Sequence, residues 1–160
     1  MKKTDLLAYL DEKMQKLDFD GNLSLNWDKK QHTFTIGMEF FVENHSIREI
    51  IDAENVKSLE PVINFYDEIL LYDQTANLKA ESENYLVCLP FDGKKGWTQG
   101  KADAFLAVLQ KTLDDGESDL LDFVNDENQE VFELKWDSNE FQQKQSDFSS
   151  ETDRLKYPKF

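Results

Sequence analysis

The chain has 160 residues, of which 39% are apolar, and its 33 acidic and 18 basic side chains give a formal net charge of −15. This length suits one domain with one core, and no apolar run approaches the roughly 18 residues of a membrane-spanning helix. The charge argues against nucleic acids and anionic membranes as partners, because both are bound through clustered Lys and Arg. A single cysteine cannot form an internal disulfide, so we expect a cytoplasmic location.

The N-terminal part of the chain predicts a helix followed by a hairpin. Thr4 is placed to cap a helix with one apolar face over residues 6–17. Apolar and polar residues then alternate over 23–27 and 33–43, with the polar turn 28–31 between them. This alternation predicts two antiparallel strands with one face on the core.

The next segments are less regular. Residues 47–52 could form a short strand. Residues 62–72 are rich in β-branched and aromatic side chains, which favours a strand, although the alternation slips at Asp67 and Glu68. A bulge would account for the slip. The same apolar residues also fit a period of 3.6, so a helix remains an alternative for this segment.

A strand, a glycine loop and a long helix form the strongest pattern in the chain. Residues 85–89 are apolar on both faces, which predicts a central strand, and Pro90 is expected to end its pairing. From about Thr98 an apolar stripe at helical spacing predicts a long helix. The stripe consists of Ala102, Phe105, Leu106, Leu109 and Leu113.

The C-terminal part predicts three shorter elements. Asp115-Gly116 indicates the end of the long helix, and Ser118 could cap a short helix over 119–125. Alternation over 132–136 predicts a last strand, and Ser138 is placed to cap a closing helix.

Together these elements predict an α+β fold. A largely antiparallel sheet is flanked by the N-terminal, long central and C-terminal helices in one two-layer domain, residues 1–145. From about Ser146 the composition is polar with little to bury, which predicts a mobile C-terminal tail over 146–160.

The loop from Gly93 to Gly100 lies where phosphate-binding loops lie, between a strand and a helix. Its glycine spacing does not fit the P-loop, and Ala102 stands where that motif has a hydroxyl residue. A plain turn is therefore the favoured interpretation. The candidate ligand-binding residues are Lys94, Lys95 and Lys101.

No residue pattern indicates catalysis, a metal site or a cofactor. Cys88 lies inside an apolar strand, where a thiol is usually an inert core residue. His32 and His45 have no acid at ligand spacing, so we expect surface or turn histidines.

Residues 112–134 carry nine acids and no Lys or Arg, the most one-sided charge in the chain. Most acidic surfaces serve solubility, but this one could also contact a basic partner. The candidate partner-binding residues are Asp119, Asp122 and Asp126.

Three runs of residues carry a resemblance to a known family. Residues 85–96, 115–123 and 131–137, together with Trp27-Asp28, resemble a Firmicutes family of small acidic proteins, domain of unknown function 3013. The resemblance covers nearly the whole chain and fades after about Gln145. It implies a cytoplasmic bacterial protein and transfers no catalytic residue.

The sequence favours a non-enzymatic protein-binding module, similar in kind to secretion-chaperone-like folds, with a basic protein surface as partner. Such folds often act as dimers, so a homodimer is a further expectation. This is an analogy between folds, and a fold alone does not define function. The alternative is a domain or enzyme that binds a small molecule or phosphate through the Gly93–Gly100 loop.

Overall fold

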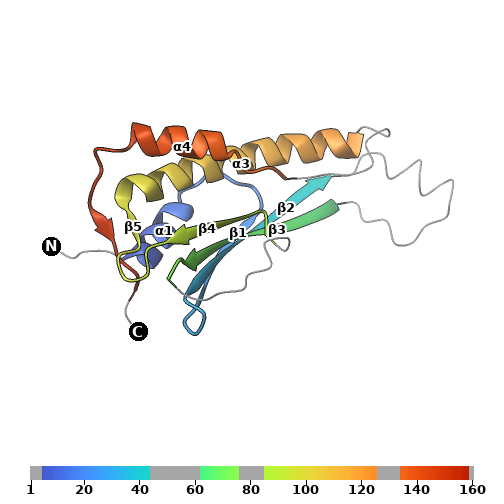
Figure 1. Ribbon diagram of the computed structural model, residues 1–160. Coiled ribbons are helices and arrows are strands. Elements are labelled where there is room, and N and C mark those ends of the chain that lie inside the picture. Colours follow the sequence, from blue (N-terminus) through green and yellow to red (C-terminus); the bar gives the residue numbers. More distant parts are fainter. Residues whose placement is uncertain (1–4, 44–61, 76–84, 126–133, 159–160) are drawn as a thin grey trace.

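The computed structural model describes residues 5–43, 62–75, 85–125 and 134–158. In these residues, helices cover one face of a four-stranded sheet (Figure 1), which confirms the predicted α+β class. The strand order is β1-β2-β3-β4, with antiparallel neighbours except for the parallel pair β3–β4. The strands are β1 (Asn22–Asp28), β2 (Thr33–Glu43), β3 (Val62–Asp73) and β4 (Val87–Phe91).

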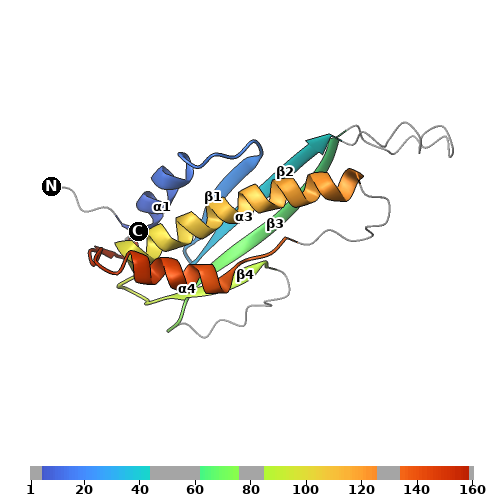
Figure 2. The same ribbon diagram turned by 90° about the horizontal axis from the view of Figure 1, so that it is seen from above.

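The helical layer is built around one long helix. From above (Figure 2), this helix crosses the sheet, with the first helix on the β1 side and the last on the β4 side. The helices are α1 (Leu6–Met14), α3 (Gln99–Asn125) and α4 (Ser138–Asp147). A second, two-stranded sheet pairs β5 (Trp97–Thr98) with β6 (Arg154–Leu155).

The predicted hairpin of β1 and β2 is confirmed. Its register runs from Asn22 opposite Glu39 to Asp28 opposite Thr33. The inward side chains of β2 are fully covered by the helices, whereas those of β1 are half-buried because β1 is an edge strand. The buried side chains of β2 are Phe34, Ile36, Met38 and Phe40.

Residues 62–72 form a strand, and the expected bulge is wrong. β3 pairs with β2 without interruption from Tyr72 to Val62. The alternation slips because Asp67 occupies an inward position, opposite Met38. Burial raises the pKa of the Asp67 carboxyl.

The strand predicted over 85–89 lies at an edge of the sheet, not at its centre. It begins at Val87 and includes Pro90, which pairs with Tyr72. Proline is tolerated there because an edge strand has no neighbour on its other side. Cys88 lies opposite Leu70 and is half-buried, so the expectation of a core cysteine is wrong. Burial raises the pKa of its thiol.

Two predicted helices are present with caps one residue away from those expected. Asp5 caps α1 by accepting a hydrogen bond from the Ala8 amide at 2.7 Å, and Thr4 lies outside the described residues. Asp137, not Ser138, caps α4 by accepting from the Glu140 amide at 3.0 Å. A carboxylate satisfies an unpaired helix amide and also complements the positive end of the helix dipole.

The predicted apolar stripe of α3 is buried, but the expected stop at Asp115-Gly116 is wrong. The helix continues through Gly116 to Asn125, so the two predicted helices are one. A Cβ at Gly116 would lie 2.6 Å from Leu134 Cδ1 and 2.8 Å from Phe40 Cε2. Glycine is therefore needed there for close packing and not as a cap.

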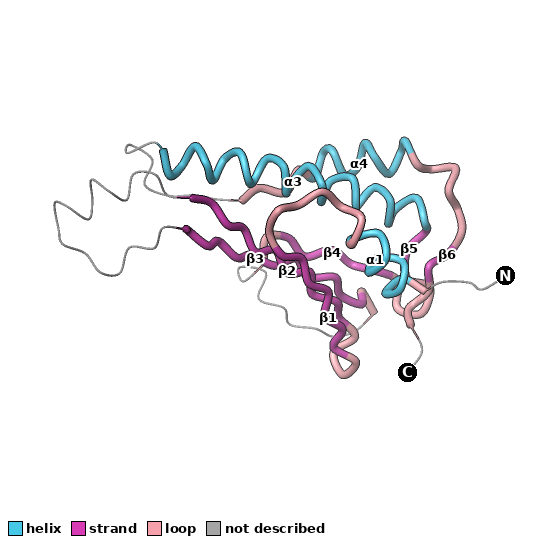
Figure 3. The backbone as a smooth tube through the Cα atoms, turned by 180° about the vertical axis from the view of Figure 1, so that it is seen from behind, coloured by secondary structure: helices cyan, strands magenta, loops and turns pink. Residues whose placement is uncertain are grey.

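The C-terminal segment is packed against the domain. After α4 the chain descends past the start of α3 to β6 (Figure 3). Leu155 is buried, and the Tyr157 ring stacks on Phe91 and His32 with centroids 5.6 and 5.0 Å away. The expectation that this segment has little to bury is therefore wrong.

Two further strand predictions have different outcomes. The described residues of the strand predicted over 132–136, which are 134–136, form no strand, and residues 47–52 lie outside the described part.

Candidate functional site

The second half of α3 presents acidic side chains to solvent. Asp114, Asp115, Asp119 and Asp122 are all exposed. Two of the predicted partner-binding residues, Asp119 and Asp122, thus lie on one turn of the same helix. The third, Asp126, lies outside the described residues.

One basic side chain, Lys111, neutralises part of this surface. Lys111 Nζ lies 2.6 Å from Asp115 Oδ2 and 3.9 Å from Asp137 Oδ2. The hydrogen bond that the Lys111 ammonium donates to the Asp115 carboxylate raises the pKa of Lys111. Within the described part of the chain, Asp119 and Asp122 have no ion pair. The uncompensated charge therefore lies toward the C-terminal end of α3.

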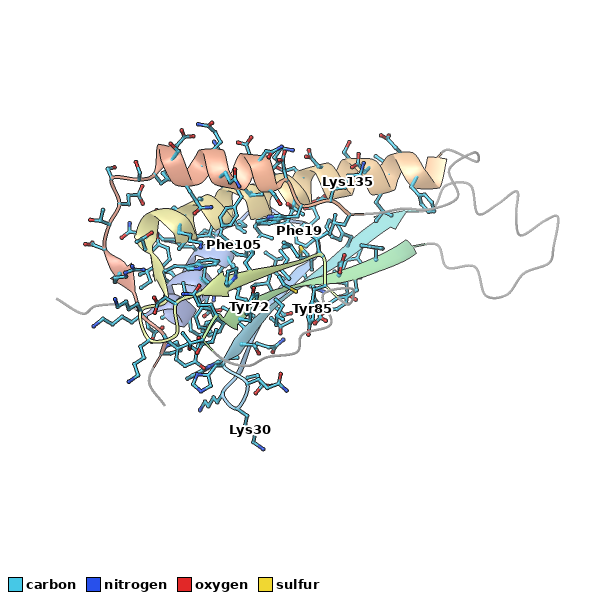
Figure 4. All side chains as sticks on the ribbon, in the orientation of Figure 1. Phe19, Lys30, Tyr72, Tyr85, Phe105 and Lys135 are labelled. Carbon is cyan, nitrogen blue, oxygen red and sulfur yellow. The ribbon has the colours of Figure 1, made fainter. Side chains whose placement is uncertain are left out.

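A groove of about 540 Å³ lies beside this acidic surface, between α3 and residues 134–139. Asp115 and Asp119 line it from the helix, and Leu134 and Trp136 line it from the opposite side. Lys135 also lines the groove and is exposed along α3 (Figure 4). The groove thus combines apolar surface with carboxylates.

Trp136 has an unusual position in this groove. Its ring packs between Phe105 and Phe141, with centroids 5.5 and 5.7 Å away. Its Nε1 is buried and has no hydrogen-bond acceptor among the described residues. Sequence reasoning missed Leu134 and Trp136 as groove residues. Their alternation signalled burial but not the element they would face.

A second group of acids lies where α3 passes the turn between α1 and β1. Burial, followed by the charges of Asp20, Asp114 and Asp18, raises the pKa of Glu117. The three aspartates therefore make a negative environment for a half-buried carboxyl.

The backbone of the loop from Gly93 to Gly100 packs against the C-terminal segment and bonds to it. Gly96, with φ +64°, approaches Leu155 so closely that a Cβ would lie 1.9 Å from its carbonyl oxygen. The Gln99 amide donates to Asp153 O at 2.7 Å and the Gly100 amide to Glu151 O at 2.9 Å. The first amides of α3, which a phosphate would need, are thus bonded to the C-terminal segment.

The three candidate lysines of this loop do not share one contact. Lys94 and Lys95 are exposed. The Lys101 ammonium lies 5.3 Å from the centre of the Trp97 ring, and burial lowers its pKa. Anion binding by these lysines remains a prediction.

No group of three or more His, Cys, Asp or Glu residues in the described ranges is arranged to hold a metal ion. His32 packs on Tyr157 at the end of the hairpin, and its Nδ1 lies 3.9 Å from Asp73 Oδ2. His45 lies outside the described residues. None of the described helices is long and apolar enough to cross a membrane.

The fold and groove define a small α+β domain with an acidic helix along a partly apolar groove. The chain belongs to the family described as "Protein of unknown function (DUF3013)", whose model matches residues 1–159. The predicted resemblance is therefore confirmed, and the match extends beyond Gln145.

A solved structure has the same fold. It is the "Crystal Structure of Conserved Protein of Unknown Function from Enterococcus faecalis", with a TM-score of 0.85 and 34% sequence identity. The alignment covers 99% of this chain and 98% of that one. No curated protein matches the chain.

Proposed function

We propose that this protein is a non-enzymatic, chaperone-like module of the cytoplasm that binds a basic and apolar segment of another protein along the second half of α3. One observation carries the proposal: the exposed acids of this half are placed where they oppose helix stability. The single cysteine supports the cytoplasmic location.

The electrostatic cost has two sources. The C-terminal end of a helix carries partial negative charge, so an acid in the last turn loses about 0.3–1 kcal/mol relative to a favourable placement, and Asp122 lies in the last turn of α3. Asp119 and Asp122, which have no ion pair in the described part of the chain, are also three residues apart, which brings like charges together on one face. The last turn of α3 contains no basic residue. A basic partner would relieve both effects.

The groove explains why the partner segment should also be apolar. Leu134 and Trp136 line it opposite Asp115 and Asp119. A segment with alternating basic and apolar side chains can place its charges on the helix and its apolar groups on the groove. Burial of apolar surface contributes roughly 25 cal/mol per Å², and the charge pairs contribute specificity and rate of association.

The first experiment measures fluorescence anisotropy of a labelled Lys–Leu peptide and a matched Glu–Leu peptide. We expect the wild type to bind the basic peptide and not the acidic one, and to lose affinity as salt increases. Asp119→Lys/Asp122→Lys should weaken binding by roughly tenfold or more while thermal stability rises, because a lysine is favourable in the last turn of a helix, where Asp122 lies.

Asp11→Lys/Glu12→Lys is the matched control, because it makes the same charge change at two exposed positions of α1. It should retain most of the binding. Equal loss in both variants would reduce the effect to net charge, and unchanged binding in the α3 variant would refute the proposed surface. Affinity capture from a bacterial lysate with the same pair would then identify the natural partner.

A further inference from the structure

β1 is an edge strand that lacks the features that usually prevent an edge from pairing with a further strand. All its residues pair with β2 on one side, and no described backbone group bonds to it on the other. Natural edge strands are commonly short or carry Lys, Pro or a bulge, as the opposite edge does with Pro90. β1 has none of these, and its one charge, Asp28, accepts hydrogen bonds from the Lys30 and Gln31 amides.

The inward side chains of β1 are also incompletely covered. Leu23, Leu25 and Trp27 are half-buried, although their β2 neighbours are fully buried. Another strand at this edge would bond to the outward backbone groups of β1 and extend the apolar surface beside these three residues.

We propose that β1 pairs antiparallel with β1 of a second copy of this chain, about a two-fold axis at Leu25. This is the only register that pairs all seven residues of β1, since Leu25 is its midpoint. Side chains directly opposite share a face of the sheet, so apolar residues meet apolar ones. The pairs are Leu25 with Leu25, Leu23 with Trp27, Ser24 with Asn26, and Asn22 with Asp28.

Charge complementarity continues beyond the strand ends. Asp20 precedes β1 by two residues and Lys30 follows it by two, so the same register brings Asp20 of each copy near Lys30 of the other. Lys30 is exposed at the tip of the hairpin, away from the helices (Figure 4). Asp20 belongs to the acidic group around Glu117, together with Asp18 and Asp114. A second copy thus supplies a countercharge to this group at both ends of the interface.

A charge swap tests the interface without changing the core. Sedimentation velocity at low salt should show a wild-type dimer. Asp20→Lys and Lys30→Asp should each weaken dimerisation by about tenfold, because each places like charges together twice. The double variant should return to within about threefold of wild type. A monomeric wild type, single variants that dimerise normally, or a double variant no better than the singles would overturn the proposal.

Cross-linking tests the register. Residues opposite each other in antiparallel strands have Cα atoms about 4.5–5.5 Å apart, within the range of a disulfide. Leu25→Cys, in a Cys88→Ser background, should form a covalent dimer on mild oxidation. Asn22→Cys should not, because the two copies of that residue would be about 20 Å apart. Equal cross-linking of the two variants, or none at Leu25→Cys, would contradict the pairing. This inference does not depend on the proposed peptide-binding function.

Discussion

The two halves of α3 differ in what surrounds them. From Gln99 to Leu113, the helix packs its apolar stripe against α1, α4 and the sheet, and its first amides bond to the C-terminal segment. From Asp114 to Phe123, the buried positions are Gly116 and Leu120, and the exposed positions are mostly acidic. One continuous helix thus combines a half that stabilises the domain with a half whose charges oppose helix stability.

The difference separates two explanations for the acids. If they served solubility alone, they could be spread over any exposed surface and mixed with lysines. Instead they gather on the C-terminal half of α3, with Asp122 in the last turn at the negative end of the helix dipole, and beside a groove with apolar walls. Residues that reduce stability in this way often belong to functional sites.

The largest expected effect comes from a substitution in the first half of α3. Phe105→Ala removes a fully buried ring that contacts Trp97 and Trp136, so the free energy of unfolding should fall by about 3–5 kcal/mol. Leu121→Ala, in the second half of α3, removes a side chain that is 44% exposed. It should change the free energy of unfolding by about 0.5 kcal/mol or less. Urea unfolding of both variants measures the contrast, and similar losses would show that the two halves are equally packed.

An intermediate effect tests whether the C-terminal segment belongs to the packed region. Tyr157→Ala removes a ring that stacks on Phe91 and a hydroxyl that accepts a 2.6 Å hydrogen bond from Trp27 Nε1. We expect a loss of about 2 kcal/mol from the hydrogen bond and the lost apolar contact. Lys156→Ala, its exposed neighbour, is the control and should lose about 0.5 kcal/mol or less. A thermal melt that is the same for both variants would support the mobile tail.

The smallest expected effect on stability comes from Glu117, in the second half of α3. The pKa of Glu117 is raised in the folded state, so the folded protein holds this proton more tightly than the unfolded chain does. Stability should therefore fall as pH rises from the unfolded pKa through the folded one. Glu117→Gln should remove this decline and raise stability at pH 7 by about 0.2–0.5 kcal/mol, comparable to removal of one like-charge helix pair.

The measurement for Glu117→Gln is urea unfolding between pH 3 and pH 7. Glu12→Gln, an exposed residue of α1, is the control. The gain over wild type should shrink toward pH 3. A gain that is constant with pH would mean that the charge of Glu117 is not its cause.

The sequence predicts those parts of the fold in which local pattern and packing agree. Alternation in 33–43 and the stripe from Ala102 to Leu113 each have one face on the core, so periodicity is sufficient. The prediction of a helix end fails at Gly116, because the local signal is outweighed by close packing on Phe40. The prediction of a central strand fails at β4, because a strand with apolar residues on both faces can also lie at an edge.

The candidate site is predictable only in part. The one-sided charge marks Asp119 and Asp122, since exposed charge can be read directly from composition. The groove cannot be read in this way, because Trp136 reaches it through a contact between segments far apart in the sequence. The closure of the glycine loop by residues 151–155 is likewise a long-range contact.

The most direct test of the acidic surface is a titration of the isotope-labelled protein with the Lys–Leu peptide, followed by amide chemical shifts. We predict that the shifts concentrate at residues 114–123 and 134–139 and are lost in Asp119→Lys/Asp122→Lys. Shifts that concentrate at residues 93–101, or no shifts at any peptide concentration, would contradict the proposed binding surface.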